Sequence, residues 1–214
     1  MHIQALTFNP FQENTYLLWN KNHEAAIVDP GCLDAYEEQH LLHFIEKNGL
    51  KPVLLINTHM HLDHIFGNQF VSKQWNLKAK ASLKDQFWLD KFEKQCVIFG
   101  ITPPPSKGPM IVEGIQEGDT LFLGDEKIEI YEVPGHSPGS LVLYMANDHA
   151  LIAGDVLFKG SVGRTDLEKG SHETLIEGIR KKILTLPEQT IVYPGHGSTT
   201  TVGQEKKSNP FLWE

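Results

Sequence analysis

The chain opens with short apolar runs that are separated by polar turn residues. These runs are β-prone, and asparagine or proline stands in the turns between them, over residues 3–8, 15–19 and 24–28. The spacing predicts three strands in an antiparallel meander. Asp29-Pro30-Gly31 then ends the meander with residues that are typical of a turn.

A helical pattern and a buried strand follow the meander. Asp34, with Glu37 three residues later, predicts a helix start of the capping-box type, and apolar residues at helical spacing continue this helix to Asn48-Gly49. The uninterrupted apolar run Val53-Leu54-Leu55-Ile56 predicts a buried strand. The pattern then predicts a helix over residues 65–75, a short strand over 78–81 and a helix from Ser82.

Strands dominate the second half until the chain ends in helices. The predicted strands are residues 120–123, 127–133, 141–145, 150–153 and 191–193. Helices are predicted from Ser171 and over residues 201–207. Residues 100–109 carry four prolines and are either a lid over a site or an inert connection, with the lid favoured because long loops are often functional. The mixture predicts an α/β or α+β fold of packed sheets, in one domain over residues 1–214.

Composition narrows the class of protein. The 214 residues are 40% hydrophobic and 21% charged, as in ordinary globular proteins, and the net charge of -8 disfavours nucleic acid as a partner. The N-terminus lacks the charged and apolar regions of a signal peptide, and no apolar stretch has the length of a membrane span. Cys32 and Cys96 form no disulfide framework. We therefore expect a cytoplasmic protein without membrane or nucleic-acid partners; the oligomeric state is left open.

The strongest chemical signal follows the predicted buried strand. Residues 57–64 read Asn-Thr-His-Met-His-Leu-Asp-His, which places four potential metal ligands within six positions. His59 and His61 point the same way on an extended segment and can bind one ion, whereas Asp63 and His64 can face a second position. Imidazole nitrogens and carboxylate oxygens suit zinc, iron or manganese. A surface loop rich in histidine is the alternative, but this density of ligands favours metal.

Three later residues complete the set. His136, Asp155 and His196 each follow an apolar strand and a glycine, and glycine permits backbone conformations that aim a side chain into a cleft. Each alone could be a turn residue. Together they predict one ion held by His59, His61 and His136, a second held by Asp63, His64 and His196, and Asp155 as a bridge between the two. The other six histidines lack ligand spacing and are interpreted as surface residues.

The order His-x-His-x-Asp-His, Gly-His, Gly-Asp, Gly-His resembles the metallo-β-lactamase superfamily over nearly the whole chain. This resemblance implies a four-layer αββα sandwich with the metal site at one edge. True β-lactamases usually have cysteine at the position of Asp155. With aspartate there, the chain resembles the branch that includes hydroxyacylglutathione hydrolase (glyoxalase II). The run Gly163-Arg164-Thr165-Asp166 resembles the short bacterial members of that branch. Longer members carry a C-terminal helical domain that contacts glutathione; we do not expect it here, so the thiol carrier is left open.

The resemblance implies a metal-dependent hydrolase, most simply a thioesterase that cleaves S-2-hydroxyacylglutathione or a related thioester. Two divalent cations, with zinc expected first and iron or manganese as alternatives, would lower the pKa of a bridging water so that hydroxide can attack the carbonyl carbon. Asp63 could bind metal and also orient that hydroxide. The alternatives are a persulfide dioxygenase with one iron at His59, His136 and Asp155, or a hydrolase of another small ester or lactone.

Two residues near this centre have two interpretations each. The resemblance implies that Arg164 holds the carboxylate of the substrate; an Arg164–Asp166 pair that shapes the loop is the alternative. Asp29 is either a carboxylate that supports the ligands or a plain turn residue.

Overall fold

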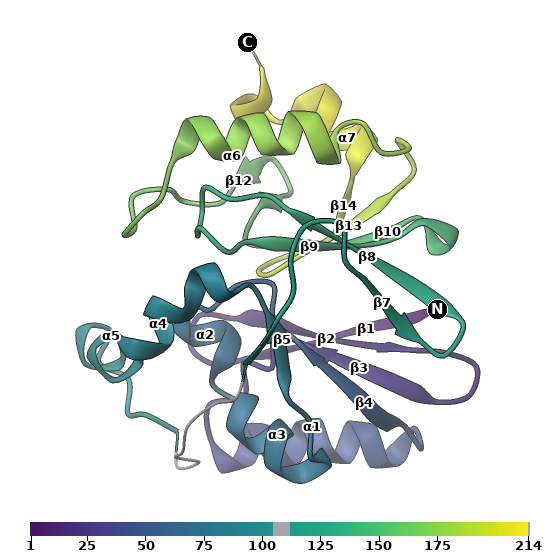
Figure 1. The fold of residues 1–214 in the computed structure, drawn as a ribbon, viewed down its shortest axis with the longest axis vertical. Coiled ribbons are helices and arrows are strands. Elements are labelled where there is room, and N and C mark those ends of the chain that lie inside the picture. Colours follow the sequence, from purple (N-terminus) through teal and green to yellow (C-terminus); the bar gives the residue numbers. More distant parts are fainter. Residues whose placement is uncertain (105–111, 214) are drawn as a thin grey trace.

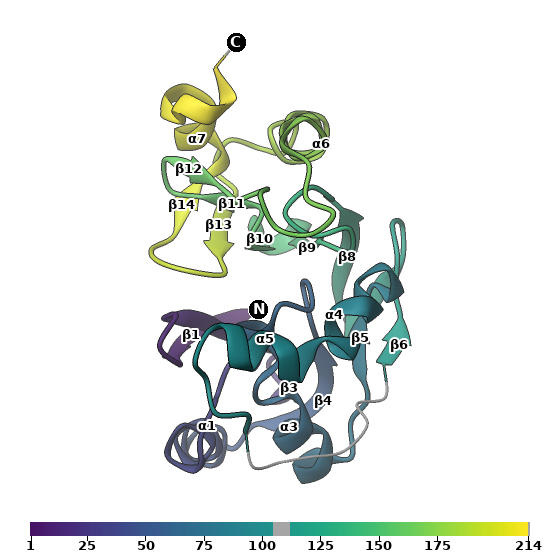
Figure 2. The ribbon, with the colours of Figure 1, turned by 90° about the vertical axis from the view of Figure 1, so that its left-hand side faces the viewer.

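Two six-stranded β-sheets packed face to face form the centre of the molecule (Figure 1). The structure is a computed structural model that describes residues 1–104 and 112–213. The strand order is β1-β2-β3-β4-β5-β6 in the first sheet and β14-β13-β10-β9-β8-β7 in the second. Figure 2 shows α1 and α3 outside the first sheet and α6 and α7 outside the second. This arrangement is the predicted αββα sandwich.

The first sheet combines the predicted meander with three parallel strands. Its strands are β1 (His2–Phe8), β2 (Glu13–Trp19), β3 (Glu24–Val28), β4 (Lys51–Ile56), β5 (Ala79–Ala81) and β6 (Val112–Gly114). Pairing is antiparallel from β1 to β3, which confirms the meander, and parallel from β3 to β6. Parallel neighbours need crossover connections, and helices supply them between β3, β4 and β5. Strand β6 was not predicted, because its residues Val-Glu-Gly show neither an alternating nor a continuous apolar pattern.

The helices of this half are α1 (Ala35–Lys47), α2 (Leu62–Ile65), α3 (Asn68–Trp75), η1 (Leu83–Asp85), α4 (Gln86–Asp90) and α5 (Phe92–Ile98). Asp34 caps α1 as predicted, because its side chain accepts hydrogen bonds from the backbone of Tyr36 and Glu37. The capping box is incomplete, since the Glu37 carboxylate accepts instead from the backbone nitrogens of Asn9 and Leu33.

The prediction of one helix over residues 65–75 is wrong at its start. The helical turn α2 already begins at Leu62, so Asp63 and His64 lie on a helix. The helix is interrupted after Ile65, and α3 begins after Gly67. The break has a packing cause. The Gly67 backbone nitrogen donates to Pro30 O at 2.7 Å, and a Cβ at this position would lie 2.2 Å from Cys32 Sγ.

The second sheet is antiparallel except for one pair. Its strands are β7 (Thr120–Leu123), β8 (Glu126–Glu132), β9 (Leu141–Met145), β10 (Ala150–Gly154), β13 (Ile191–Pro194) and β14 (Thr200–Thr201). The parallel pair is β10 with β13. The remaining elements are η2 (Ala146–Asp148), the hairpin β11 (Leu157–Phe158) and β12 (Ser161–Val162), α6 (His172–Gly178), the π-helical η3 (Ile179–Ile183), α7 (Val202–Ser208) and η4 (Pro210–Leu212). The predicted strands and helices of this half are present, with end points shifted by a few residues.

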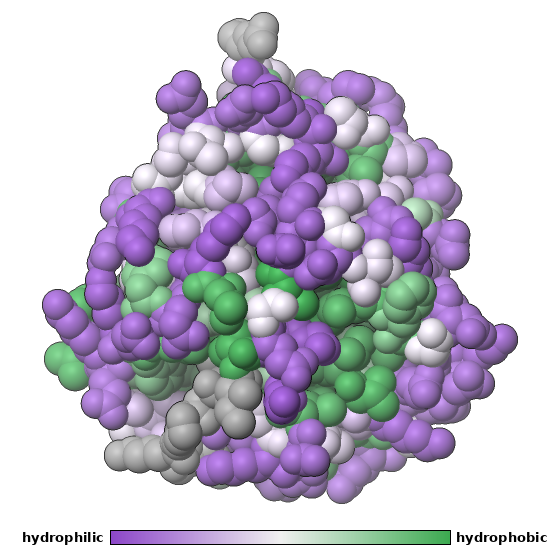
Figure 3. Space-filling view, in the orientation of Figure 1, coloured by the Kyte–Doolittle hydropathy of each residue, from purple (hydrophilic) through white to green (hydrophobic). Residues whose placement is uncertain are grey.

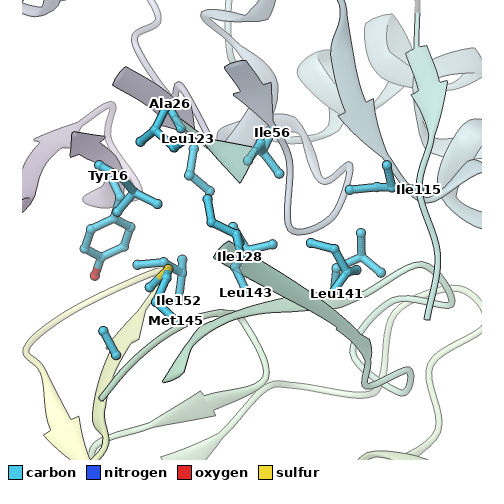
Figure 4. Close-up of a cluster of buried hydrophobic side chains, with 14 residues drawn as sticks. Tyr16, Ala26, Ile56, Ile115, Leu123, Ile128, Leu141, Leu143, Met145 and Ile152 are labelled. Atoms are coloured by element: carbon cyan, nitrogen blue, oxygen red, sulfur yellow. The ribbon is translucent and has the colours of Figure 1, made fainter. Parts of the chain in front are cut away.

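The main core lies between the two sheets. In Figure 4, Ile56 of β4 faces Ile128 and Leu143 of the second sheet, and all three side chains are fully buried. Two further apolar clusters fill the spaces between each sheet and its helices. Figure 3 shows mainly hydrophilic residues over the outer layers, with hydrophobic residues gathered toward the middle of this face. The two sheets are therefore held together by apolar contact.

Half of the predicted lid, residues 105–109, lies outside the described part of the chain. Within residues 1–104 and 112–213, no helix combines the length and the apolar character that a membrane span requires.

Truncating a side chain between the sheets should destabilise the whole molecule. We expect Leu143→Ala to lower the free energy of unfolding by about 2–5 kcal/mol, because it removes buried methyl groups and leaves a cavity. Leu83→Ala is the matched control: this leucine is 56% exposed, so the loss should be about 1 kcal/mol or less. Urea unfolding monitored by circular dichroism measures both. Equal losses would contradict the assignment of the core.

Candidate metal centre

All seven predicted ligands meet at one edge of the sandwich. His59 and His61 lie in the loop after β4, and Asp63 and His64 lie on α2. The other three follow strands of the second sheet: His136 comes after β8, Asp155 after β10 and His196 after β13. The two sheets therefore contribute four and three side chains to the same place.

His59, His61 and His136 form the first cluster, with their ligand atoms within 4.8 Å of one another. The Nε2 atom of His136 lies 3.3 Å from His59 Nε2 and 2.9 Å from His61 Nδ1. Three imidazoles thus converge on one point, two through Nε2 and one through Nδ1.

Asp63, His64 and His196 form the second cluster, also within 4.8 Å. Asp63 Oδ2 lies 3.3 Å from His196 Nε2 and 3.8 Å from His64 Nε2. The His59 and His64 rings are 4.1 Å apart between centroids, so the two clusters are adjacent.

Asp155 lies between the clusters. Its Oδ2 atom is 3.6 Å from His136 Nε2 in the first cluster and 3.6 Å from His196 Nε2 in the second. Its Oδ1 atom is 3.4 Å from His64 Nε2. The carboxylate therefore reaches both clusters, as the predicted bridge requires.

Hydrogen bonds on the outer side of the rings fix which nitrogen faces the centre. His136 Nδ1 donates to Arg164 O at 2.8 Å and His196 Nδ1 donates to Phe11 O at 3.0 Å, since a carbonyl oxygen can only accept. In the neutral ring the Nε2 lone pair is then left to face the centre. Carbonyl partners of this kind are typical of metal-binding histidines.

Asp29 supports His64 and is more than a turn residue. It is buried, and its Oδ2 atom accepts from His64 Nδ1 at 3.1 Å and from Thr58 Oγ1 at 2.5 Å. Its Oδ1 atom accepts from the Thr58 backbone nitrogen at 2.7 Å. Asp29 thereby ties the end of β3 to the loop after β4 and orients the His64 ring.

Two of the glycines that flank the ligands are required by space. A Cβ on Gly195 would lie 2.2 Å from Asp155 Oδ1 and 2.8 Å from His64 Cε1. Gly154 has a φ of +48°, and a Cβ there would lie 2.4 Å from Thr58 Oγ1. A side chain at either position would displace the loops that carry the ligands.

The electrostatic environment differs between the clusters. Burial and the neighbouring histidines lower the pKa of His61 to about 3 and hold the pKa of His59 well below its ordinary value. Burial by itself would also lower the pKa values of His64 and His196, but the carboxylates of Asp155 and Asp63 outweigh burial and raise both pKa values. Burial by itself would raise the pKa of Asp155, but the neighbouring His64 outweighs burial and lowers this pKa.

These residues fit metal ions. Buried polar atoms normally have partners, yet His64 Nε2 and Asp155 Oδ1, which face the centre, have no hydrogen-bond partner among the described residues. Neutral imidazole nitrogens that face one another within 3.3 Å present lone pairs that a cation would satisfy. Nitrogen and carboxylate donors are those that zinc, iron and manganese accept.

A family model of the metallo-beta-lactamase superfamily matches residues 8–196. The chain belongs to the metallo-β-lactamase superfamily. It is 38% identical to the hydroxyacylglutathione hydrolase GloC of Haemophilus influenzae over 215 residues, which cover 99% of this chain and 98% of that protein.

Two solved structures are also similar. The B3 metallo-β-lactamase BLEG-1 matches with a TM-score of 0.90 and 35% identity and is covered, like this chain, over 100% of its length. TTHA1623 in a di-iron-bound form matches with a TM-score of 0.87 and 32% identity, over 98% of this chain and 100% of that one. The fold is therefore the metallo-β-lactamase fold, and the chain is a metal-dependent hydrolase of that superfamily.

Arg164 forms an ion pair with Asp166, as one of the two interpretations of this residue predicted. Its Nε and Nη2 atoms donate to the two carboxylate oxygens of Asp166, each at 2.7 Å, and both side chains are more than half exposed. The backbone oxygen of Arg164 also holds His136. The loop-shaping interpretation therefore has direct support, and the substrate role stays a prediction.

The sequence analysis did not identify three buried polar residues that surround the candidate metal centre. Glu13 is fully buried with Oε1 3.9 Å from His64 Nδ1, and burial raises the pKa of its carboxyl. Asn14 contacts the loop of His196, and Asp85 contacts the loops of His61 and His136. The only signal in the sequence was a polar residue next to an apolar run, which is equally typical of an exposed turn.

Zinc affinity should depend on pH more steeply at the second cluster. In the metal-free protein His64 and His196 have raised pKa values, so they must release protons on binding, and affinity falls as pH drops below those values. Each proton released costs up to about tenfold in affinity per pH unit. His59 and His61 are already neutral in this range.

Chelator competition at pH 6, 7 and 8 measures both slopes. The variant His61→Ala keeps the second cluster, and His196→Ala keeps the first. Equal slopes would contradict this assignment.

Proposed function

We propose that this protein is a binuclear metal-dependent thioesterase of glyoxalase II type, which hydrolyses S-2-hydroxyacylglutathione or a related thioester. The observation that carries the proposal is the complete set of seven side chains, with the Asp155 carboxylate in reach of both clusters. The full-length similarity to a hydroxyacylglutathione hydrolase supports the choice of substrate class.

His59, His61 and His136 would hold one ion, Asp63, His64 and His196 the other, and Asp155 both. Zinc is the expected metal, with iron and manganese as alternatives. When bound, the two ions would supply Lewis acidity and make a water molecule acidic enough to react near neutral pH. The chain supplies the geometry: carbonyl and carboxylate partners on the outer side fix His64, His136 and His196 before metal or substrate arrives.

Asp63 is the proposed catalytic residue. Burial disfavours its charge, but His64 and the hydrogen bond with His196 outweigh burial and lower the pKa of Asp63, so it is ionised at neutral pH. An ionised carboxylate can accept a hydrogen bond from the attacking water and orient it toward the carbonyl carbon. A thiolate is a good leaving group, so the reaction requires no strong general acid, which agrees with the absence of a free acid in this set.

His196 is the most exposed histidine of the centre. The His196 side chain is 26% exposed, against 0% for His64 and 3% for His136. Phe158 lies beside it, with 6.4 Å between the ring centroids, and Phe11 supplies the carbonyl that holds it. A substrate that approaches here meets apolar surface next to the metal ligands, which suits the acyl or thiol portion of a small thioester.

Metal content and turnover test this proposal together. Protein purified without added metal should contain close to two ions per chain and should hydrolyse S-lactoylglutathione. Chelation should abolish the activity and readdition of zinc should restore it. Asp63→Asn should lower kcat by about 100-fold or more, because several kcal/mol of stabilisation is lost and each 1.36 kcal/mol is a factor of ten.

Other outcomes would redirect the assignment. One iron per chain, with oxygen consumption on glutathione persulfide and little thioesterase activity, would replace the hydrolase by a dioxygenase. Turnover of a chromogenic cephalosporin in preference to thioesters would favour β-lactam hydrolysis, to which the similarity to BLEG-1 points.

Arg164 and Asp166 can be separated by a matched pair of variants. If Arg164 holds a substrate carboxylate, Arg164→Ala should lower kcat/KM by about 10- to 100-fold, the value of a charged hydrogen bond, while Asp166→Ala should leave it nearly unchanged. If the pair only shapes the loop, the two variants should have equal effects. Steady-state kinetics on a thioester with a carboxylate and on one without it makes the comparison.

A further inference from the structure

Two buried residues of the first half of the chain hold loops of the second sheet at the metal edge. Asp85 ends η1, directly after β5, and Asn14 lies in β2. Both are buried, with 0% and 6% of their surface exposed. Each makes several hydrogen bonds, and the two sets of bonds reach different clusters.

Asp85 connects the two loops that carry the first cluster. Its Oδ2 atom accepts from the backbone nitrogen of Met60, which lies between His59 and His61, at 3.1 Å. Its Oδ1 atom accepts from Ser137 Oγ at 2.5 Å and from the Gly139 backbone nitrogen at 2.7 Å. One carboxylate thus joins the residue between two ligands of the first sheet to the turn that follows His136.

The surroundings of Asp85 are closely packed. A Cβ on Gly139 would lie 2.6 Å from Asp85 Cγ, so glycine is required for this approach. Ser137 Oγ also accepts from Trp88 Nε1 at 3.2 Å, and the Trp88 ring packs against His61 with 4.7 Å between centroids. The network therefore positions His61 from its outer side as well as through the backbone.

Asn14 connects the first sheet to the loop of His196. Its Nδ2 atom donates to Pro194 O at 3.1 Å and to Gly197 O at 2.9 Å, on the two sides of His196. Its backbone nitrogen donates to Gly195 O at 2.7 Å, and Thr7 Oγ1 donates to its Oδ1 atom at 3.1 Å. The Tyr16 hydroxyl donates to the same Pro194 oxygen at 2.7 Å. Four hydrogen bonds, to the carbonyl oxygens of Pro194, Gly195 and Gly197, thus hold the loop from which His196 projects.

We propose that Asp85 and Asn14 are positioning residues for separate metal positions, Asp85 for the His59–His61–His136 position and Asn14 for the Asp63–His64–His196 position. This inference rests on the proposed binuclear centre. The two sheets contact each other through apolar side chains, which resist separation but tolerate small sliding, whereas directional hydrogen bonds set a loop to within a few tenths of an ångström. Residues that orient metal ligands typically contribute about 10- to 100-fold in metal affinity.

The test combines each change with a background that keeps one cluster. His196→Ala leaves the first cluster complete, and His61→Ala leaves the second. We expect Asp85→Asn to weaken zinc binding by about 10- to 100-fold in the His196→Ala background and by less than about threefold in the His61→Ala background. Asn14→Ala should give the reverse. Zinc dissociation constants come from competition with a chromophoric chelator.

Cobalt(II) spectra give a readout that a general loss of stability would not change. Asp85→Asn should alter the visible absorption of cobalt bound at the first cluster, and Asn14→Ala that of cobalt at the second, because the spectrum reports ligand geometry. Asp85→Glu keeps the charge but changes its reach, so it should shift the spectrum as well. Unchanged spectra with Asp85→Glu would assign the effect to charge and overturn the positioning role.

Glu205→Gln controls for the loss of a buried carboxylate. Glu205 is 1% exposed and accepts from Thr200 Oγ1, the Gly160 backbone nitrogen and Asn209 Nδ2. This variant should lose stability and keep both zinc affinities. If Asp85→Asn or Asn14→Ala does not fold, Ser137→Ala removes the bonds to Asp85 and Trp88, and Tyr16→Phe removes the bond to Pro194. Both variants should show the same selectivity with a smaller effect.

The outcomes separate this inference from the proposed function. Wild-type protein with two zinc sites, and variants that weaken both sites equally or neither, would overturn the positioning roles and leave the binuclear centre intact. Wild-type protein that binds fewer than two ions would overturn the centre itself and this inference with it.

Discussion

The apolar contact between the two sheets is the interaction on which the candidate metal centre depends. Four of the seven candidate ligands follow β4, and three follow strands of the second sheet. Each of the two clusters includes one residue from the second sheet, since His136 completes the first and His196 the second. The fully buried core between the sheets, with Ile56, Ile128 and Leu143 among its members, keeps the loop ends within bonding distance of one another.

The arrangement at this edge divides polar atoms into two groups. Burying an imidazole or carboxylate atom without a hydrogen-bond partner is unfavourable. At this edge the buried atoms that face away from the centre and those that face into it differ in this respect. The outer atoms of His64, His136 and His196 have carbonyl or carboxylate partners within the chain. Inner atoms such as His64 Nε2 and Asp155 Oδ1 have none among the described residues. The stability of the metal-free centre is thus limited by the same atoms that would bind the ions.

Membership of the superfamily gives the fold and the general chemistry, while the substrate depends on loops around the entrance. A fold of this kind can serve several reactions, because the reaction depends on the residues placed at one edge. Here the side chains near the ligands include the Arg164–Asp166 pair and the aromatic residues Phe11 and Phe158 beside His196. These side chains, more than the seven ligands, would distinguish one small thioester or ester from another.

The sequence by itself determined most strands, most helices and the seven candidate ligands. Alternating and continuous apolar runs report on burial of a local segment, and the density of ligands in residues 59–64 is a local signal as well. The tertiary structure alone decided that Asp63 and His64 lie on a helical turn, that Asp29 supports His64, and that Asp85 and Asn14 hold loops distant in the chain. A hydrogen bond such as that from Asn14 to Gly197, 183 positions apart, leaves no periodic pattern. A single polar residue beside a strand looks the same in the sequence whether it faces water or a buried carbonyl.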